Sequence, residues 1–288
     1  MSDSDTFSAA ALQRLTGLKA FPQPSIIPTR HPVVFMHGFG IGASFRREGH
    51  LHDEVMHLRS RGVRAIAPNV SPYNTVSARC EMWEDRLDRI LAELNDERFS
   101  IIAHSMGGLD ARHLISNRGW HDHVTALVTV ATPHRGSSIA SLTLDQPETV
   151  RKWLSEMADW VGTHVLEDGS ADFRQSLREL TPEYVQETFN PAVPDHPDVE
   201  YWSYGCRAGR GTDTPIDPIF RYFNAHLYDH EGVNDGIVSV DSARWGQYLG
   251  TIDADHARQV GIKSRLAADF DSNAFYTAIA ERLAEHGY

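Results

Sequence analysis

The sequence has little cysteine, no long hydrophobic run and no excess of positive charge. Its 288 residues include two cysteines, too few for a disulfide framework, so both are expected to be buried free thiols in a reducing compartment. Apolar runs such as Val33–Met36 reach only four residues, whereas a membrane-spanning helix needs about 20. The 27 Lys and Arg stand against 39 Asp and Glu, and the net charge of −12 offers no attraction to phosphate backbones or anionic lipid. We therefore expect neither a transmembrane segment nor a nucleic-acid partner.

Residues 1–30 are predicted to form an N-terminal arm. The chain opens Met-Ser-Asp-Ser-Asp, with acid where a secretory signal peptide carries Lys or Arg, so we expect no cleaved signal and a cytoplasmic location. A short helix is expected first, and Pro22, Pro24 and Pro28 prevent its continuation.

Residues 31–288 are predicted to form one α/β domain. Short β-rich runs alternate with longer segments of helical periodicity, which is typical of a mostly parallel central sheet with helices on both faces. The clearest helix carries Cys80, Trp83 and Leu87 at helical spacing. Strands are predicted at 33–37, 63–67, 100–103, 124–130, 200–205 and 248–252, and a final helix over 275–283.

An insertion at about 138–198 interrupts this alternation, since it contains helical patterns but no convincing strand. Within it, residues 150–165 place apolar side chains, including Trp153 and Trp160, on one stripe of a helix. Most amphipathic helices simply pack, so a helical cap is the simpler interpretation. The alternative is a mobile lid that covers an apolar site and opens at a lipid surface.

Ser105 is the strongest candidate for a catalytic nucleophile. It lies between an apolar strand and a helix in the sequence Ala103-His-Ser-Met-Gly107. A strained strand-turn-helix elbow exposes a serine hydroxyl and requires small residues two positions before and after it, as Ala103 and Gly107 provide. The backbone amide of Met106 then faces a developing oxyanion. Neighbours on a strand point to opposite faces, so His104 is expected to be a packed or hydrogen-bonded histidine.

A nucleophilic serine needs a histidine to accept its proton and a carboxylate to orient that histidine. On such a sheet the acid and then the base follow the serine along the chain. His256, in a polar loop after a predicted strand, fits the base better than His286, which suits the capping of a C-terminal helix. Asp235 in Asn-Asp-Gly precedes a β-rich run and is the favoured acid, although Asn-Asp-Gly also suits a plain turn. Position alone leaves three rivals open, namely Asp217, Asp229 and Asp241.

The second donor of an oxyanion hole is expected from the glycine-rich loop after the first strand, where the backbone amide of Phe39 is the candidate. His50, His52, Asp53 and His57 together resemble a ligand set. However, the helical two-histidine zinc pattern needs an i, i+4 spacing with a Glu after the first His, so we expect a solvated helix face and no metal. Neither a P-loop nor a G-x-G-x-x-G motif is present, which gives nucleotide cofactors no support.

Together these segments resemble the bacterial true lipases, the calcium-dependent triacylglycerol lipase family with an α/β-hydrolase fold. The resemblance spans about residues 32–261 and is most specific in Thr132-Pro-His-Arg-Gly-Ser137 and Asn234-Asp-Gly-Ile-Val-Ser239. It implies Ser105 as nucleophile, Asp235 as acid and His256 as base, with the amides of Phe39 and Met106 as the oxyanion hole. It also implies that the 138–198 insertion is a lid.

The resemblance fails at the calcium site. The family uses two carboxylates, one matched by Asp217 and one two residues after the catalytic histidine, where this sequence has Arg258. A guanidinium would repel a dication that needs oxygen ligands. We therefore expect no calcium, and we hypothesise that an ion pair between Arg258 and Asp217 steadies the loop of His256 instead.

The sequence therefore predicts a serine hydrolase that cleaves carboxylic esters of lipids through an acyl-enzyme and contacts the lipid–water interface through its lid. A short-chain carboxylesterase or thioesterase, or a phospholipase or acyltransferase, would use the same three residues. A non-catalytic acyl-binding protein would not need them. Because some members of the family leave the cell without a cleaved signal, export of that kind is the alternative to a cytoplasmic location.

Overall fold

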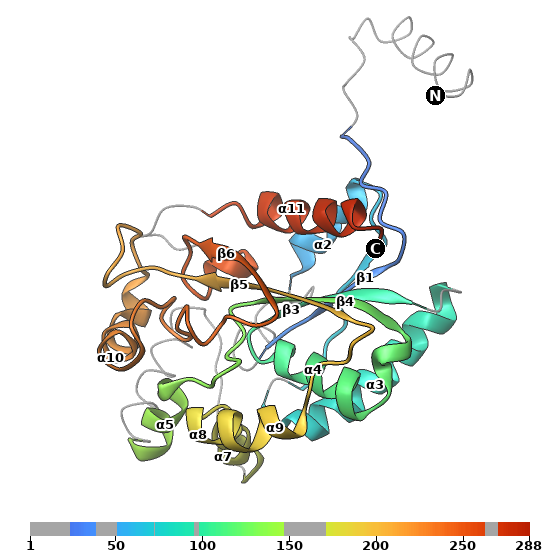
Figure 1. Cartoon of the computed structure of the whole chain (residues 1–288). Coiled ribbons are helices and arrows are strands. Elements are labelled where there is room, and N and C mark those ends of the chain that lie inside the picture. The colour runs from blue at the N-terminus through green and yellow to red at the C-terminus, as the bar shows by residue number, and fades with distance from the viewer. Residues whose placement is uncertain (1–23, 39–50, 72, 95–97, 147–170, 263–269) are drawn as a thin grey trace, which may run out of the picture.

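A parallel β-sheet forms the centre of the molecule (Figure 1). The computed structural model describes residues 24–38, 51–71, 73–94, 98–146, 171–262 and 270–288. Within these residues the sheet has six strands in the order β2-β1-β3-β4-β5-β6, and every neighbouring pair is parallel. Because all the strands run the same way, their carboxyl ends meet at one edge. The strands are β1 (Val33–Met36), β2 (Ala65–Ile66), β3 (Phe99–His104), β4 (Val124–Val130), β5 (Glu200–Cys206) and β6 (Gln247–Ile252).

Helices cover both faces of the sheet, as the sequence predicts. Successive strand residues point to opposite faces, so Val34 and Met36 join one hydrophobic core and Val33 and Phe35 join the other. In Figure 1 the helices of the first core lie below the sheet and those of the second lie above it. The helices of the first core are α3 (Val76–Leu94) and α4 (Gly107–Asn117), and those of the second are α2 (His52–Ser60) and α11 (Ser272–Glu285).

The six predicted strands are confirmed to within about two residues at each end, and β4 has the predicted bounds. The β-rich run expected after Asp235 is wrong, because residues 234–239 form a turn closed by an isolated antiparallel bridge between Asn234 and Ser239. The reason is local: the Asp235 carboxylate accepts from the amides of Ile237 and Val238 at 2.9 and 2.8 Å, which bends the backbone instead of extending it.

The described part of the 138–198 insertion is helical. It lies below the carboxyl-end side of the sheet in Figure 1 and precedes β5, while α10 (Arg221–Glu231) follows β5. The predicted amphipathic helix at 150–165 and most of the N-terminal arm, residues 1–23, lie outside the described residues. Among the described residues, no helix is both long and apolar enough to cross a membrane. The insertion's helices are α5 (Ser138–Asp145), α7 (Ala171–Arg178), α8 (Pro182–Tyr184), a π-helical turn Val185–Phe189 and α9 (Asn190–Ala192).

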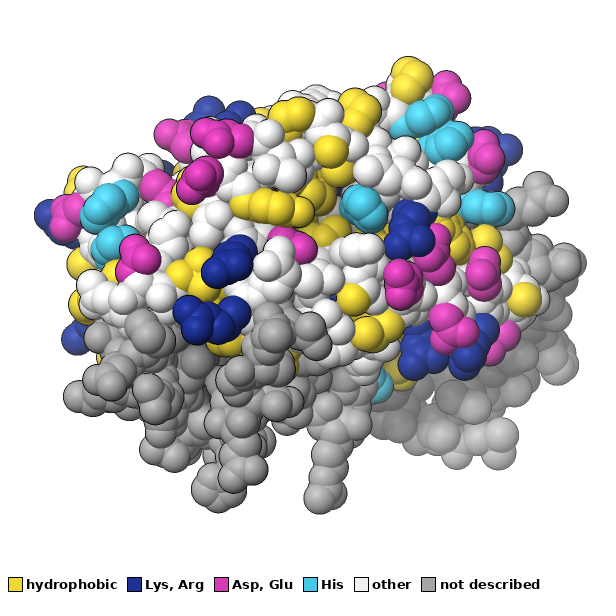
Figure 2. Space-filling model, turned by 90° about the horizontal axis from the view of Figure 1, so that it is seen from below, with side chains coloured by type: hydrophobic (Ala, Val, Ile, Leu, Met, Phe, Trp, Pro, Cys, Tyr) yellow, Lys and Arg dark blue, Asp and Glu magenta, His cyan; other side chains and the backbone are white. Residues whose placement is uncertain are grey.

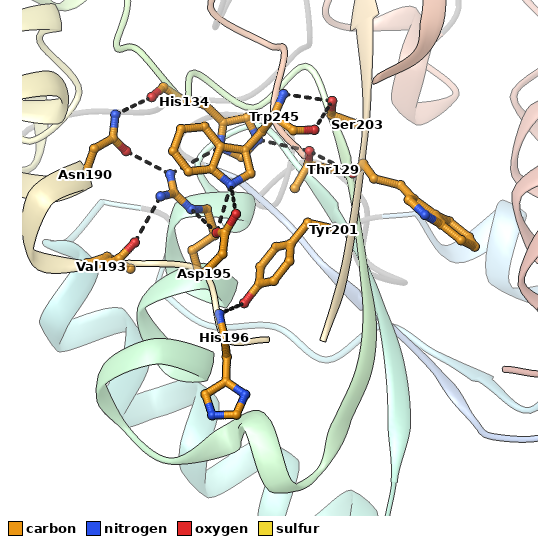
Figure 3. A network of polar contacts seen from close by, with 11 residues as sticks. Thr129, His134, Asn190, Val193, Asp195, His196, Tyr201, Ser203 and Trp245 are labelled. Carbon is orange, nitrogen blue, oxygen red and sulfur yellow. Dashed lines mark hydrogen bonds and ion pairs between the residues drawn. The ribbon is translucent and has the colours of Figure 1, made fainter. Parts of the chain in front are cut away.

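A buried arginine of α4 holds the end of this insertion, and Figure 3 shows its partners Asn190, Val193 and Trp245. The guanidinium of Arg112 lies 3.6 Å from the ring centroid of Trp245 and donates to the Asn190 side chain at 2.9 Å and to the Val193 carbonyl at 3.1 Å. The indole of Trp245 in turn donates to the Asp195 carboxylate at 2.9 Å. Burial lowers the pKa of Arg112 to about 10. These contacts hold residues 190–195 against α4 and the segment before β6.

His134, from the Thr-Pro-His-Arg-Gly-Ser element, completes this network. The Thr129 hydroxyl donates to the Trp202 carbonyl at 3.3 Å, so its oxygen accepts from Nε2 of His134 at 3.0 Å. Nδ1 of His134 is then the acceptor that faces Arg112 at 3.4 Å. Burial, with the charges of Arg112 and Arg135, holds the pKa of His134 well below its ordinary value. The histidine is therefore a neutral structural partner of the arginine.

Candidate active site

Ser105 lies at the end of β3 in the strained turn that the sequence predicts. Its φ of 56° is left-handed, a conformation that costs a residue other than glycine on the order of 1–3 kcal/mol. Two contacts hold the turn: the Ser105 amide donates to the Val130 carbonyl at 2.9 Å, and the Thr132 hydroxyl donates to the Ser105 carbonyl at 2.7 Å. The neighbouring strand β4 and the loop after it therefore fix the backbone of the candidate nucleophile.

Glycines let three segments converge on this turn. A Cβ added to Gly107 would lie 2.6 Å from the Met36 carbonyl oxygen, so the start of α4 can approach the end of β1 only without a side chain. A Cβ on Gly38 would lie 2.5 Å from the Cβ of Ser105 and 2.9 Å from its hydroxyl. The loop after β1 thus runs directly beside the candidate nucleophile, where the sequence places an oxyanion hole.

Asp235 and His256 form the acid–base contact that the sequence predicts. Oδ2 of Asp235 accepts from Nδ1 of His256 at 2.8 Å, and the His256 amide donates to the Asp235 carbonyl at 3.0 Å. The carboxylate is completely buried, whereas the His256 side chain is 14% exposed. A buried carboxylate at Nδ1 leaves Nε2 as the nitrogen that can serve a nucleophile. Asp217, one of the rival acids, lies beside Asp255 instead.

The ring of His104 connects His256 to the end of β3. Its ring packs against the His256 ring with centroids 4.7 Å apart, and the residue that follows it is Ser105. The Asp235–His256 pair therefore lies against the end of the strand that leads into Ser105, at the carboxyl edge of the sheet. His104 is a packed and hydrogen-bonded histidine, as expected, since its Nε2 lies 3.0 Å from Oε1 of Gln259.

Gln259 is a site residue to which the sequence analysis gave no role. Its side-chain amide donates to Oδ2 of Asp235 at 2.7 Å, beside the bond from His256. The sequence could have indicated this role, because Gln259 follows His256 by three residues. One helical turn therefore brings both side chains to the same carboxylate. Arg258, Gln259 and Val260 do form such a turn, a 3-10 helix.

The oxyanion side of the site is partly described. The Met106 amide lies at the N-terminus of α4, directly after Ser105, while Phe39 lies outside the described residues. The loop before Phe39 is held by His37. The amide of Val70 donates to Nε2 of His37 at 3.1 Å, so the ring proton is on Nδ1 and is donated to the Gly38 carbonyl at 3.0 Å.

A buried ion pair supports this loop from behind. Arg79 of α3 and Asp110 of α4 are both fully buried, with Nη2 of the arginine 2.7 Å from Oδ2 of the carboxylate. The same Nη2 donates to the His37 carbonyl at 2.6 Å. Burial raises the pKa of Asp110, and the charge of Arg79 opposes that shift. The loop thus depends on a charge pair in the hydrophobic core.

A second buried ion pair lies beside the loop of His256, where an ion pair of Arg258 is expected in place of calcium. Nε of Arg258 donates to Oδ2 of Asp255 at 3.0 Å, and Nη2 donates to the Pro215 carbonyl at 2.7 Å. The Asp217 amide donates to the same Asp255 carboxylate at 3.2 Å. Arg258 therefore joins the loop of His256 to residues 215–217 through Asp255, a partner that the sequence analysis did not consider. A direct ion pair between Arg258 and Asp217 remains a hypothesis.

A guanidinium among these oxygens does not suit a bound dication. Nor do the described residues elsewhere hold a group of three or more His, Cys, Asp or Glu side chains arranged for a metal ion. Of the histidine-rich segment, His50 lies outside the described residues, and α2 begins at His52. Cys80 and Cys206 are free and buried, as the sequence predicts.

The chain is similar in sequence to known hydrolases. Residues 32–193 match the family model described as palmitoyl protein thioesterase. Triacylglycerol lipase 2 of Saccharomyces cerevisiae is 28% identical over 240 residues, which cover 78% of this chain and 66% of that protein. The triacylglycerol lipase of Burkholderia plantarii is 26% identical over 145 residues, 49% of this chain and 40% of that protein. The chain thus spans less than two thirds of the length of these relatives.

Solved structures establish the fold. The crystal structure of Bacillus licheniformis lipase BlEst2 in mature form matches with a TM-score of 0.66 at 20% identity, covering 91% of this chain and 96% of that one. The parallel sheet and its helices on both faces are therefore those of an α/β-hydrolase, the fold class that the sequence predicts.

Proposed function

The chain belongs to the palmitoyl protein thioesterase family of α/β-hydrolases, and from that premise we propose that it is a serine hydrolase of lipid carboxylic esters. The observation that carries this proposal is the meeting of three elements at one edge of the sheet. These are the strained Ser105 turn, the Asp235–His256 hydrogen bond of 2.8 Å, and the His104 ring that joins them. An adjacent base and a buried orienting carboxylate are what a serine hydroxyl needs to become a nucleophile.

The reaction proceeds by two acyl transfers. Oγ of Ser105 bonds to the ester carbonyl carbon while its proton passes to Nε2 of His256, and the charge on the carbonyl oxygen is met by the Met106 amide. The imidazolium returns its proton to the departing alcohol as the carbon–oxygen bond breaks. Water then attacks the acyl-enzyme with His256 as base again, releasing the acid and restoring the Ser105 hydroxyl. Throughout, the Asp235 carboxylate accepts from Nδ1–H of His256.

Replacing the nucleophile tests the proposal. We expect Ser105→Ala to lower kcat for a p-nitrophenyl ester by about 10⁴–10⁶-fold, because the acyl-enzyme cannot form. The matched control is Ser60→Ala, the same change at an exposed position of α2, which should leave kcat unaltered. Near-complete activity in the Ser105 variant would refute the mechanism. Labelling of the wild-type protein by a fluorophosphonate would distinguish a folded hydrolase from an acyl-binding protein.

The substrate class rests on the relatives. Two relatives of this chain are named triacylglycerol lipases, which supports a lipid oxyester as substrate. The family match to palmitoyl protein thioesterase favours a second candidate, the thioester of a long-chain acyl group. Both proceed through the same acyl-enzyme, so they differ in the leaving group alone. Paired oxyester and thioester substrates of one acyl chain, compared by kcat/KM over a series of chain lengths, separate them.

Contact with an interface would have to be apolar. The face shown in Figure 2 intersperses acidic, basic and apolar side chains, and the whole chain has a net charge of −12. Attraction to anionic headgroups therefore does not supply binding, and the proposed contact is the apolar stripe that the sequence predicts at residues 150–165, which lie outside the described residues. A rise in specific activity when a soluble ester passes into an emulsion supports this role, and an unchanged activity contradicts it.

The enzyme requires no calcium in this proposal, because Arg258 supplies the positive charge between the loop of His256 and residues 215–217. Arg258 is 4% exposed and its Asp255 partner is fully buried, so the pair is shielded from solvent. Activity and thermal stability in a chelator should equal those in added calcium. Arg258→Ala should lose both stability and activity, since it leaves the Asp255 carboxylate buried without its partner. A loss of stability on chelation of the wild-type protein would contradict the proposal.

A further inference from the structure

The carboxylate of Asp235 binds more than its histidine. Oδ2 of Asp235 accepts from Nδ1 of His256 at 2.8 Å and from Nε2 of Gln259 at 2.7 Å, while Oδ1 accepts from two backbone amides. An ionised carboxylate can only accept hydrogen bonds, so the NH₂ group of Gln259 must be the end that faces it. The oxygen of that amide then faces His104 at 3.0 Å, and Nε2 of His104 must carry the proton.

We propose that Gln259 and His104 are positioning residues of the catalytic acid: Gln259 fixes the Asp235 carboxylate that orients His256, and His104 fixes the amide of Gln259. This inference rests on the proposed hydrolase function. It assigns the pair no contact with the substrate. Their contribution lies in where the Asp235 carboxylate is held when His256 becomes charged.

The Gln259 amide needs an anchor because it has two orientations. Rotation by 180° would place its carbonyl oxygen against Oδ2 of Asp235, where two acceptors repel each other, and would remove one donor from a buried charge. The N–H of His104 favours the productive orientation, since it can bond only to the oxygen end. His104, Asp235 and Gln259 are fully or nearly buried, at 5%, 0% and 0% exposure, so water does not readily replace either bond.

The network also joins the segments that carry the three catalytic residues. His104 ends β3 and directly precedes Ser105, Asp235 lies in the turn after α10, and Gln259 follows His256 in the loop after β6. The His104 ring packs on the His256 ring at a centroid distance of 4.7 Å and restricts its rotation. A single amide therefore connects the nucleophile's strand to the acid, while the neighbouring ring connects that strand to the base.

Four variants test the proposal. Gln259→Met keeps the side-chain length and removes both hydrogen bonds, so kcat should fall roughly 10- to 100-fold with KM unchanged, the effect of losing a bond to a charged group. His104→Phe keeps the ring that packs on His256 and removes the donor, and it should give a similar but smaller loss. His104→Gln places an amide donor where Nε2 was and should restore most of kcat. The side chain of His104→Asn is too short to bring its donor to that position, so this variant should not restore kcat.

Two exposed positions supply matched controls: Gln247→Met and His286→Phe repeat the chemical changes outside the network and should leave kcat unchanged. Each rate is expressed per folded molecule. Thermal unfolding shows that each variant is folded, and fluorophosphonate titration of Ser105 gives the concentration of reactive sites. The double variant Gln259→Met with His104→Phe should be no slower than Gln259→Met alone, because His104 acts through Gln259. Additive losses overturn that link. Activity of Gln259→Met within twofold of wild type overturns the proposal, and so does equal rescue by His104→Asn and His104→Gln.

A second measurement needs no turnover and separates this inference from the proposed function. Long-range ¹H–¹⁵N NMR on the full chain should find His104 with its proton on Nε2, and Gln259→Met should move the Nδ1–H resonance of His256. If the wild-type protein hydrolyses no ester but these spectra are as expected, the proposed function fails and the positioning network stands. A proton on Nδ1 of neutral His104, or an unmoved His256 resonance, overturns the network whatever the activity.

Discussion

The buried pair of Arg79 and Asp110 gives a prediction in which stability and activity should separate. Both side chains are 0% exposed, and Oδ2 of Asp110 accepts from Nε of Arg79 at 2.8 Å, from its Nη2 at 2.7 Å and from the Trp83 indole at 3.1 Å. Asp110→Leu leaves the guanidinium in the core without a counter-charge. Breaking a buried pair in this way costs about 3–5 kcal/mol of unfolding free energy.

That loss corresponds to a fall in melting temperature of roughly 6–20 °C, at about 2–4 °C per kcal/mol for a large single domain. The double variant Arg79→Met with Asp110→Leu removes both charges, and it should recover at least half of the loss because an apolar pair needs no counter-charge. Its activity should stay low. Nη2 of Arg79 also donates to the His37 carbonyl at 2.6 Å, and no methionine can hold the loop after β1 in this way.

Urea unfolding of the two single variants and the double variant supplies the free energies, and kcat per fluorophosphonate-labelled site supplies the activity. The reasoning is wrong if Asp110→Leu costs less than about 1 kcal/mol, well under the 3–5 expected for a broken buried pair. It is equally wrong if the double variant is less stable than either single variant. A double variant that regains stability and full kcat would show that Arg79 supports the core but not the loop.

Two further predictions concern single residues. The pKa of His134 is held well below 6.5 in the folded state, so on acidification the unfolded chain binds a proton that the folded chain does not. The contribution of His134 to the free energy of unfolding should therefore be complete above about pH 6.5 and fall with acid by up to about 1.4 kcal/mol per pH unit. His134→Gln should remove this one-proton contribution from the slope of unfolding free energy against pH, measured by urea unfolding. Gly38→Ala should lower kcat by on the order of 10²-fold, because its Cβ would lie 2.9 Å from Oγ of Ser105. Gly205→Ala, where the new Cβ would meet the movable Tyr248 hydroxyl at 2.7 Å, is the comparison, and an equal loss in both variants would contradict the steric argument.

Local patterns were enough to predict the sheet and the elbow. The apolar runs that became β1, β3 and β4 are buried along their whole length, so hydrophobicity alone marks them. Ser105 could be identified because its turn imposes small residues at fixed offsets in the sequence. The turn after Asp235 could not be predicted in this way. Ile237 and Val238 have β propensity, but their backbone amides donate to the Asp235 side chain instead of to a neighbouring strand.

The supporting contacts could not be found from sequence because they join distant segments without a periodic signal. His104 and Gln259 are 155 residues apart and meet only because β3 and the loop after β6 end at the same edge of the sheet. Arg112 is buried on a helix whose pattern gives no sign that Trp245 will cover it. The partner of Arg258 differs from these in being local: Asp255 is only three residues away, and the resemblance to the lipases points instead to the distant Asp217.

The order of strands in the sheet has a consequence for synthesis on the ribosome. β4 ends at Val130 and is buried along its length, but its neighbour β5 begins only at Glu200. At about 5–20 residues per second, the growing chain therefore exposes an apolar strand edge for roughly 4–14 s before the next strand can pair with it. Ser105 is already present during that time, but Asp235 and His256 are not. The nascent chain thus carries an unpaired apolar strand edge, a feature that favours aggregation, before the residues of the proposed triad have all been made.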